Sequence, residues 1–305
     1  MIYAELAGGL GNQMFIYAFA RALGLRCNEP VTLLDRQDWK DGAPAHTVCA
    51  LNDLSISPDV QILADSGFAK AHLPRQNTAK ALMIKYEQRR GLMARDWQPF
   101  ETHCAPALNA LGLHFATDGY TPVHRGRARD FLAWGYFQSA RYFDDFADEI
   151  KAELRPKAAP AGELAAAIAA AAYPAAVHLR RGDYCRPENE ILQVCTPAYY
   201  AHAAAAVKAA HPDATLFVFS DDVDWAKQNL NTADLPAVFA PRGSAVGDMA
   251  LMEQCRGFVL SNSTYSWWAQ YLAKASDKLV LAPEKWYAHT KKSALYLPDW
   301  QLISL

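Results

Sequence analysis

The sequence has 305 residues, of which 51% are hydrophobic and 20% are charged, a composition typical of a globular protein and unlike that of a disordered chain. Thirty basic and 32 acidic residues leave a formal net charge of −2 at pH 7, which excludes whole-chain attraction to nucleic acid or to an anionic membrane. We therefore expect no nucleic-acid partner. Any basic binding site has to be local and visible as clustered arginines.

Targeting segments and metal-binding patterns are not evident in the sequence. Residues 1–6 have no basic start and no long apolar run, so they do not predict a signal peptide. Residues 164–179 form the most apolar stretch, but it is mostly alanine and too weakly hydrophobic to span a bilayer. The six cysteines show no CxxC pair and no ligand-like spacing, so we expect no structural zinc. A Cys185–Cys195 disulfide is an alternative to two free thiols, which are the simpler expectation. These features predict a cytoplasmic protein, with at most a peripheral association at the inner face of the membrane.

The first half of the chain predicts one βαβ unit and then becomes irregular. A strand pattern over residues 1–6 precedes a glycine-rich turn, an apolar helical run over residues 14–25 and a second strand over residues 31–34. Strand, glycine turn, helix and strand is the order of a βαβ unit. Residues 37–122 carry scattered Trp, Pro and His and give no readable topology. A helix is expected after residues 142–146, running to about residue 154.

The second half predicts regular alternation of strands and helices. Two prolines disfavour a continuous helix over residues 155–160, the best linker candidate. Thr196 can cap a helix that has Pro197 at its first position. The expected strands cover residues 175–179, 215–219, 237–239, 258–260 and 278–281, and the expected helices cover residues 161–172, 197–210, 248–255 and 263–274, with a short helix after Asp222. Repeated βα units of this length predict an open parallel sheet with helices on both faces.

The expected fold class is therefore α/β, with two facing Rossmann-like domains. We expect an N-terminal α/β domain over residues 1–155, a C-terminal Rossmann-like domain over residues 156–285 and a C-terminal tail over residues 286–305. Ligands of open parallel sheets bind beyond the carboxyl ends of the strands. The chemistry should therefore lie in the loops that directly follow strands.

A glycine-rich motif, Gly-Gly-Leu-Gly-Asn-Gln, follows the first strand at residues 8–13. Glycines at a strand-to-helix turn permit positive φ and let backbone amides approach an anion. The motif partly matches the dinucleotide fingerprint, with the acidic Asp35 after the second strand, but Met14 replaces the third glycine. A tight turn without a ligand is an equal alternative. Asn12 and Gln13 favour a ligand slightly, because both can direct amides at a polar group.

A second motif, His-Leu-Arg-Arg-Gly-Asp-Tyr at residues 178–184, directly follows a predicted buried strand. Its two arginines supply the local basic site that the net charge does not, and the rigid guanidinium fork suits phosphate oxygens. We therefore expect an anion site here. Asp183 is either the ion-pair partner of an arginine or a general base, and both interpretations stay open.

Two further motifs follow predicted strands. Ser-Asp-Asp at residues 220–222 places carboxylates where a ribose or base could donate hydrogen bonds to them. Asp222-Val-Asp224 also matches the DxD signature of metal-dependent sugar transfer, but Asp222 or Ser220 serves equally well as a helix cap, so we expect no metal. Residues 261–268, Ser-Asn-Ser-Thr-Tyr-Ser-Trp-Trp, offer hydroxyls and amides at a helix start, a neutral anion cradle. The two tryptophans are expected in the core.

Taken together, these motifs resemble the bacterial α-1,2-fucosyltransferases, a family that transfers L-fucose from GDP-fucose to sugar acceptors. The resemblance covers most of the chain and rests on residues 8–15, 135–139 with 142–143, 178–184, 220–222 with Trp225, and 261–268. Phe137 stands where the family often has tryptophan. Residues 37–122 match no motif that we can name, and acceptor choice is expected to lie partly there.

The resemblance implies a GT-B-type architecture with the donor in the C-terminal domain and the acceptor in the N-terminal domain. It implies an inverting, metal-independent transfer from GDP-β-L-fucose to the 2-hydroxyl of a sugar, expected to be a terminal β-galactoside of a surface glycan. GDP-fucose is a co-substrate, and no other cofactor is expected. By the same match Arg180 would contact the donor β-phosphate, Asn12 would lie near the transferred sugar, and Asp222 would contact the guanosine. Residues 263–265 would contact the pyrophosphate.

The candidate site residues fall into three groups. The candidate catalytic residues are Arg180, Asp183 and Asn12. The candidate donor-binding residues are Gly11, His178, Arg181, Ser220, Asp221, Asp222, Asn262, Ser263, Thr264 and Tyr265, and the candidate acceptor-binding residues are Gln13, Tyr136 and Gln138. Two other classes of function remain as alternatives: an NAD-dependent oxidoreductase that uses the N-terminal glycine loop, and a non-catalytic nucleotide-sugar- or glycan-binding protein.

Overall fold

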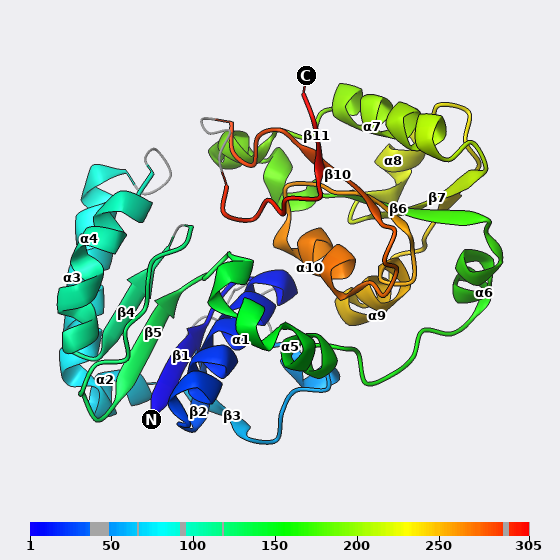
Figure 1. Ribbon diagram of the computed structural model, residues 1–305. Coiled ribbons are helices and arrows are strands. Elements are labelled where there is room, and N and C mark those ends of the chain that lie inside the picture. Colours follow the sequence, from blue (N-terminus) through cyan, green and yellow to red (C-terminus); the bar gives the residue numbers. More distant parts are fainter. Residues whose placement is uncertain (37–48, 66, 92–95, 118, 289–292, 305) are drawn as a thin grey trace. The chain divides into compact units, whose positions relative to one another are not determined.

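The computed structural model describes residues 1–36, 49–65, 67–91, 96–117, 119–288 and 293–304. The chain divides into two compact units, Met1–Arg155 and Pro156–Leu305. Each unit has its own parallel sheet with helices packed on it (Figure 1). The α/β fold class with two parallel sheets is confirmed.

The first unit is built on a five-stranded sheet in the order β3-β2-β1-β5-β4, with every pairing parallel. Its strands are β1 Ile2–Leu6, β2 Val31–Arg36, β3 Val60–Asp65, β4 Leu113–Ala116 and β5 Phe131–Gly135, its helices are α1 Leu10–Cys27, α2 Phe68–His72, α3 Pro74–Arg90, α4 Gln98–Ala110 and α5 Ala147–Glu153, and its short 3-10 helices are η3 Leu51–Asp53, η4 Ala140–Tyr142 and η5 Asp144–Phe146. In Figure 1, α3 and α4 lie on one side of this sheet and α1 on the other. In this strand order the chain connections lead away from β1 and β5 in opposite directions, so the switch point of this sheet lies between β1 and β5.

Helix α1 begins earlier than the sequence predicted. The apolar run indicated a start at Met14, but the helix begins at Leu10 with Gly9 at its N-cap. The N-cap residue has non-helical φ and ψ, and Gly9 is extended there (φ −76°, ψ 179°), so glycine is well suited to this position. Gly11, Asn12 and Gln13 therefore lie in the first turn of a helix and not in a loop.

Residues 37–122, which the sequence left unread, contain β3, α2, α3, α4 and β4 among their described residues. Both strands lie at the edges of the sheet, β4 has only four residues, and α4 carries Pro106 in its interior. These features weaken the periodic patterns from which elements are read. The helix expected after residues 142–146 is α5, which ends at Glu153, and the 3-10 helices η4 and η5 precede it.

The second unit has a six-stranded parallel sheet in the order β11-β10-β9-β6-β7-β8. Its strands are β6 Tyr173–Leu179, β7 Ala214–Ser220, β8 Ala237–Phe239, β9 Gly257–Val259, β10 Leu279–Pro283 and β11 Gln301–Ile303, its helices are α6 Glu163–Ala170, α7 Pro197–Ala210, α8 Val223–Asn229, α9 Ala245–Met252 and α10 Thr264–Leu272, and its 3-10 helices are η6 Gly182–Cys185 and η7 Pro187–Leu192. Counted from β6, this is the strand order 3-2-1-4-5-6 of dinucleotide-binding folds, whose ligands bind at the switch point between strands 1 and 4. That switch point lies between β6 and β9.

Most elements of this unit agree with the sequence prediction. Helix α7 spans the predicted residues, and the hydroxyl of its N-cap, Thr196, accepts a hydrogen bond from the Tyr199 N–H. The buried strands β6 and β7 pair over their whole length, from Tyr173 opposite Ala214 to Leu179 opposite Ser220. The tryptophans 267 and 268 are fully buried, as expected.

The structure corrects the expectation of a separate C-terminal tail. Residues 286–305 were expected outside the second domain, but they belong to the second unit. Within them, β11 pairs in parallel with β10, from Leu281 opposite Gln301 to Pro283 opposite Ile303. A three-residue strand with two exposed positions has no readable alternation, which explains the error.

The six cysteines are free thiols, so the alternative of a Cys185–Cys195 disulfide is excluded.

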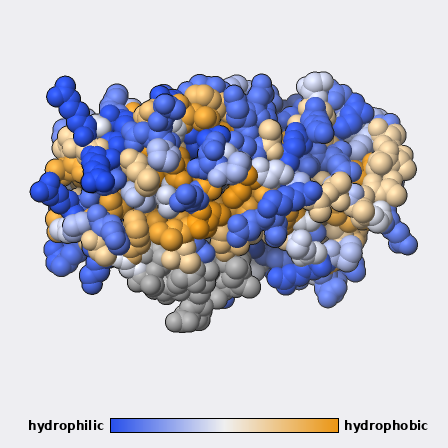
Figure 2. All heavy atoms as spheres, turned by 90° about the horizontal axis from the view of Figure 1, so that it is seen from below, coloured by the Kyte–Doolittle hydropathy of each residue, from blue (hydrophilic) through white to orange (hydrophobic). Residues whose placement is uncertain are grey.

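Hydrophilic residues spread over the face drawn in Figure 2, with hydrophobic residues gathered between them. Among the helices of the described residues, none is long and apolar enough to cross a membrane.

Candidate functional site

Three of the predicted motifs lie at the carboxyl ends of neighbouring strands in the second unit. Residues 178–184 run out of β6, residues 220–222 end β7, and residues 261–265 follow β9. Strand β6 pairs with both β7 and β9, so the three motifs meet around the switch point of this sheet. Ligands of this strand order bind there.

Arg180 is held by two carboxylates. Its Nη1 donates to Asp221 Oδ2 at 2.9 Å, and its Nη2 donates to Asp183 Oδ1 at 2.5 Å. The guanidinium carbon also lies 5.5 Å from the ring centroid of Tyr184. The Arg180 side chain is 26% exposed, so a ligand can reach it. Both Asp183 and Asp221 are therefore ion-pair partners of Arg180, which was one of the two interpretations of Asp183.

Asp221 organises the backbone of the arginine motif as well as its side chain. Asp221 Oδ1 accepts a hydrogen bond from the Arg181 backbone N–H at 2.9 Å. A Cβ at Gly182 would lie 2.7 Å from Asp221 Oδ2, so the absent side chain at Gly182 permits this close approach. Sequence reasoning named Asp221 as a donor contact and did not foresee this pairing.

Asp222 and Ser220 make the local contacts expected of a helix start. Asp222 caps α8 by accepting from the Trp225 N–H at 3.2 Å, and the Ser220 hydroxyl accepts from the Asp222 N–H at 3.0 Å. Asp222 Oδ2 also lies 3.2 Å from Arg181 Nε. The Arg181 guanidinium stacks over the Trp225 ring, with 3.7 Å from its carbon to the ring centroid.

The start of α10 supplies neutral polar groups. The hydroxyl of Ser263, the N-cap, accepts from the Tyr265 N–H at 3.3 Å, and Thr264 begins the helix. Tyr265 donates its hydroxyl to the Ala245 carbonyl at 2.6 Å.

His178 connects β6 to the Ser261 loop. Its Nδ1 lies 2.8 Å from Ser261 Oγ. Burial, together with the nearby charge of Arg180, lowers the pKa of His178 to about 3. At neutral pH this side chain is therefore an uncharged hydrogen-bonding group and adds no positive charge to the site.

Asn262 has a buried side chain that holds neighbouring segments. Its Nδ2 donates to the carbonyls of Leu192 and Trp286 at 3.0 and 2.9 Å, and its Oδ1 accepts from Cys195 Sγ at 3.5 Å. The Asn262 backbone carbonyl accepts from the Tyr184 hydroxyl at 3.1 Å. Tyr184 thus joins the arginine motif to the loop before α10. This role of Tyr184 could not be predicted from the sequence, because nothing in the chain near it shows the distant partner.

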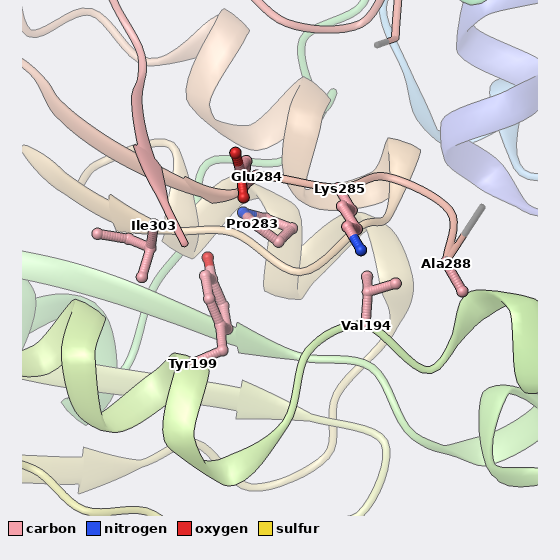
Figure 3. Close-up of a pocket in the computed structure, with 7 residues that line it drawn as sticks. All are labelled: Val194, Tyr199, Pro283, Glu284, Lys285, Ala288 and Ile303. Atoms are coloured by element: carbon pink, nitrogen blue, oxygen red, sulfur yellow. The ribbon is translucent and has the colours of Figure 1, made fainter. Parts of the chain in front are cut away.

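A cavity of about 220 Å³ lies at the carboxyl ends of β10 and β11. Figure 3 shows seven residues that line it: Val194, Tyr199, Pro283, Glu284, Lys285, Ala288 and Ile303. The Tyr199 hydroxyl donates to the carbonyls of Leu260 and Leu281. None of the predicted site residues lines this cavity.

In the first unit, Gln13 holds the glycine turn together. Its Nε2 donates to the Gly8 carbonyl at 3.0 Å, and its Oε1 accepts from the Ala50 N–H at 3.0 Å. Gln13 is only 1% exposed, so its amide serves the fold, whereas the sequence suggested a contact to the acceptor. Gly11 is also buried inside α1.

Asn12 and Gln138 come together at the other switch point, between β1 and β5. Gln138 Nε2 donates to Asn12 Oδ1 at 2.9 Å, over 126 positions of sequence. Tyr136, on the same loop, donates its N–H to the Ala116 carbonyl at 3.2 Å, and burial raises the pKa of its phenol. The structure therefore brings together Asn12 and Gln138 from two separate motifs.

The described residues carry no cluster of the usual metal ligands. Among them, no group of three or more His, Cys, Asp or Glu side chains could hold a metal ion. The DxD-like carboxylate of Asp222 is engaged with Arg181 and with the start of α8.

Known proteins resemble this chain in sequence and in fold. The family Glycosyl transferase family 11 matches residues 120–304, more than half of the chain. The O-antigen biosynthesis glycosyltransferase WbnK of Escherichia coli is 27% identical over 98% of this chain and 99% of its own length. An Escherichia coli alpha-1,2-colitosyltransferase is 27% identical over 94% of this chain and 92% of its own.

Solved structures agree on the fold. NodZ alpha-1,6-fucosyltransferase soaked with GDP-fucose covers 91% of this chain and 96% of its own, with 15% identity and a TM-score of 0.50. The same enzyme co-crystallised with GDP covers 89% and 92%, with 14% identity and a TM-score of 0.51. The Rossmann-like fold class expected from the sequence is thereby confirmed, and the family match settles the enzyme class. The chain belongs to glycosyl transferase family 11 and is a glycosyltransferase.

Proposed function

We propose that this enzyme transfers L-fucose from GDP-β-L-fucose to the 2-hydroxyl of a sugar acceptor, with inversion and without a metal ion. The observation that carries the proposal is the exposed guanidinium fork of Arg180 at the switch point of the second sheet, linked through Tyr184 to the capped start of α10. A fork and a helix N-terminus are groups that bind a diphosphate. Relatives named for α-1,2 transfer support the linkage. A Bos taurus galactoside 2-alpha-L-fucosyltransferase, 32% identical over 41% of this chain and 36% of its own, supports the donor.

The geometry fits catalysis on the leaving-group side. Breaking the bond between sugar and phosphate leaves charge on GDP while the sugar becomes oxocarbenium-like. Fixed donors and cations aimed at developing charge lower such barriers by about 3 kcal/mol each. Arg180 would stabilise the β-phosphate, and the N–H groups at Ser263–Tyr265 would contact the pyrophosphate. Asp222 would accept from the guanosine. His178 stays neutral and holds Ser261 beside them.

Asp183 is placed to hold Arg180. Its Oδ1 accepts from the guanidinium, and its backbone carbonyl accepts from Asn189 Nδ2 at 2.8 Å. We propose that it keeps the fork oriented and that the leaving-group side carries most of the acceleration. A general base would add roughly 10²–10⁴-fold in rate, so the two roles predict different losses in an Asp183 variant.

The acceptor side would be formed by the first unit. Asn12 would lie near the transferred sugar, with Tyr136 and Gln138 on the neighbouring loop. The likeness to an O-antigen biosynthesis enzyme supports a surface glycan as acceptor, and we propose a terminal β-galactoside. We also propose that the reaction takes place in the cytoplasm, with at most peripheral association with the inner face of the membrane. The likeness to a colitosyltransferase makes GDP-activated colitose the second candidate donor.

One experiment tests donor, metal and linkage together. Purified enzyme receives GDP-fucose or GDP-colitose with a β-galactoside such as lactose, with and without EDTA, and GDP release is measured. We expect acceptor-dependent release with GDP-fucose, and NMR of the product should show an α-1,2 linkage. Binding of NAD without binding of GDP in calorimetry would contradict the proposal. Turnover with GDP-colitose alone would correct the donor, and loss of turnover with EDTA would correct the metal independence.

A further inference from the structure

The loop after β5 has an unusual backbone. At Gly135 the φ is +145°, and a Cβ there would lie 1.7 Å from the Ala116 carbonyl oxygen, so only glycine fits. Two residues later, Phe137 has a φ of +52°, a left-handed value that side-chain-bearing residues seldom adopt. Its ring is 1% exposed and stacks on Phe19 with 3.9 Å between centroids. Burial of the ring thus offsets the cost of the backbone.

This turn delivers Gln138 to the glycine motif. The Ser139 N–H donates to the Phe137 carbonyl at 2.8 Å, so the chain reverses tightly at Gln138. Its Nε2 donates to Asn12 Oδ1 at 2.9 Å. Strained backbone held by the surrounding core is a feature of functional sites, and here it sets one side-chain contact at the switch point of the sheet.

The other end of the Asn12 amide lies against Gly8. A Cβ on Gly8 would come within 2.5 Å of Asn12 Nδ2, so Nδ2 occupies the space that a side chain would need. Asn12 Oδ1 therefore faces Gln138 and Nδ2 faces Gly8. An asparagine amide rotated by 180° has almost the same shape but exchanges donor and acceptor. With Gln138 oriented as it is in the structure, its N–H favours the Asn12 orientation that offers it an oxygen.

We propose that Gln138 is a positioning residue that fixes the orientation of the Asn12 amide for the transfer reaction. This inference rests on the proposed function, in which Asn12 lies near the transferred sugar. In this inference Gln138 acts on the reaction through Asn12, whereas the sequence suggested that Gln138 contacts the acceptor directly. A carboxylate at position 138 can only accept hydrogen bonds, so it favours the reversed Asn12 amide. An apolar side chain favours neither orientation.

The kinetic test compares Gln138→Glu, Gln138→Met and the control Gln76→Glu. Gln76 is a half-buried glutamine of the same unit, and its Nε2 donates to the Asp130 carbonyl at 3.2 Å. We expect kcat to fall roughly 10- to 100-fold in Gln138→Glu and about 3- to 10-fold in Gln138→Met, with no change in Gln76→Glu or in the KM for the donor. Lowering the pH should restore kcat of Gln138→Glu in part, because the protonated carboxyl donates again. Wild-type kcat in Gln138→Glu overturns the inference, as does a loss that low pH leaves unchanged.

An NMR measurement tests the same inference without activity. In the wild type and in Gln76→Glu, the side-chain N–H of Asn12 should show a nuclear Overhauser effect to Hα of Gly8. The effect should disappear in Gln138→Glu at neutral pH. If it persists, Gln138 does not set the amide, whatever the kinetics. If the wild type does not turn over GDP-fucose, the proposed donor fails, whereas this measurement still decides the orientation.

Discussion

Replacement of Arg180 by alanine is the sharpest test of the proposed chemistry. The guanidinium donates to Asp183 and Asp221 and lies over Tyr184, and it is the partly exposed cation at the switch point of the second sheet. Removing it deletes the group that we assign to the departing phosphate. It also removes the partner of two carboxylates, so effects on catalysis and on stability have to be separated.

The two effects have different sizes. Loss of one preorganised charge-stabilising group costs about 3–4 kcal/mol in the transition state, which lowers kcat by roughly 10²–10³. The three side chains are only 18–29% exposed, so the ion pairs contribute more to folding than the roughly 1 kcal/mol or less of a fully solvent-exposed pair. Asp221 also keeps its bond to the Arg181 N–H. We therefore expect Arg180→Ala to show a measurable loss of stability, which urea unfolding reports separately, and a large loss of kcat.

The assay is acceptor-dependent release of GDP from GDP-fucose, with urea unfolding of each variant. Arg256→Ala is the control, because Arg256 likewise forms an ion pair with an aspartate, Asp277, and lies 4.9 Å over an aromatic ring, that of Tyr173. It precedes β9 at the amino end of the strand, away from the switch point. We expect no change in kcat for this control. An Arg180→Ala enzyme with kcat within tenfold of the control would refute the assignment of Arg180.

Three other predictions follow from single sites. Asp183→Asn should lower kcat by less than about 100-fold and leave its pH profile unchanged, because the side chain orients Arg180; loss of the acidic limb in stopped-flow pH profiles would make Asp183 the base. His178 has a pKa of about 3 in the folded state against 6.5 when unfolded, so the unfolded chain binds the proton first and stability falls as the pH drops from 6.5 towards 3. In His178→Gln, the free energy of unfolding from urea titrations should depend on pH less steeply in this range, by about 1 kcal/mol per pH unit. An equal pH dependence in the variant and the wild type would contradict the burial argument. Gly135→Ala should cost more than about 3 kcal/mol in urea unfolding, because its Cβ would overlap the Ala116 carbonyl, whereas Gly162→Ala, with φ +92° and no atom within 4 Å, should cost only about 1 kcal/mol; equal costs would rule out the clash.

The features that depend only on neighbouring residues could be predicted from the sequence. Thr196 and Pro197 set the start of α7, because the cap and the first turn depend only on neighbouring residues. The buried strands β6 and β7 were readable as continuous apolar runs. The positions of the motifs after their strands followed from the general rule for parallel sheets. The motifs of the second unit were therefore placed at the correct edge of the sheet before the strand order was known.

Distant partners could not be predicted. Asn262 and Gln13 looked like ligand-binding amides, because an amide after a strand or in a glycine turn shows no sign of its partner. Their partners are backbone groups of Leu192, Trp286 and Ala50, and these lie 24 to 70 positions away. Tyr184 was passed over for the same reason. A side chain's hydrogen-bonding capacity is visible in the sequence, but how that capacity is used depends on the tertiary fold.

The arginine motif shows how charge and position act together. The sequence predicted a cationic site from Arg180 and Arg181, but the structure sets three carboxylates, those of Asp183, Asp221 and Asp222, against the two guanidinium groups. A diphosphate therefore meets a cluster with more acidic than basic groups, and it has to share the Arg180 fork with carboxylates that already occupy it. The carboxylates fix the orientation of the Arg180 guanidinium. A charged group that does not have to reorganise during the reaction stabilises developing charge most effectively. Tight ground-state binding is thus reduced while the alignment needed in the transition state is kept, so substitutions at Asp221 should reduce kcat more than they weaken donor binding.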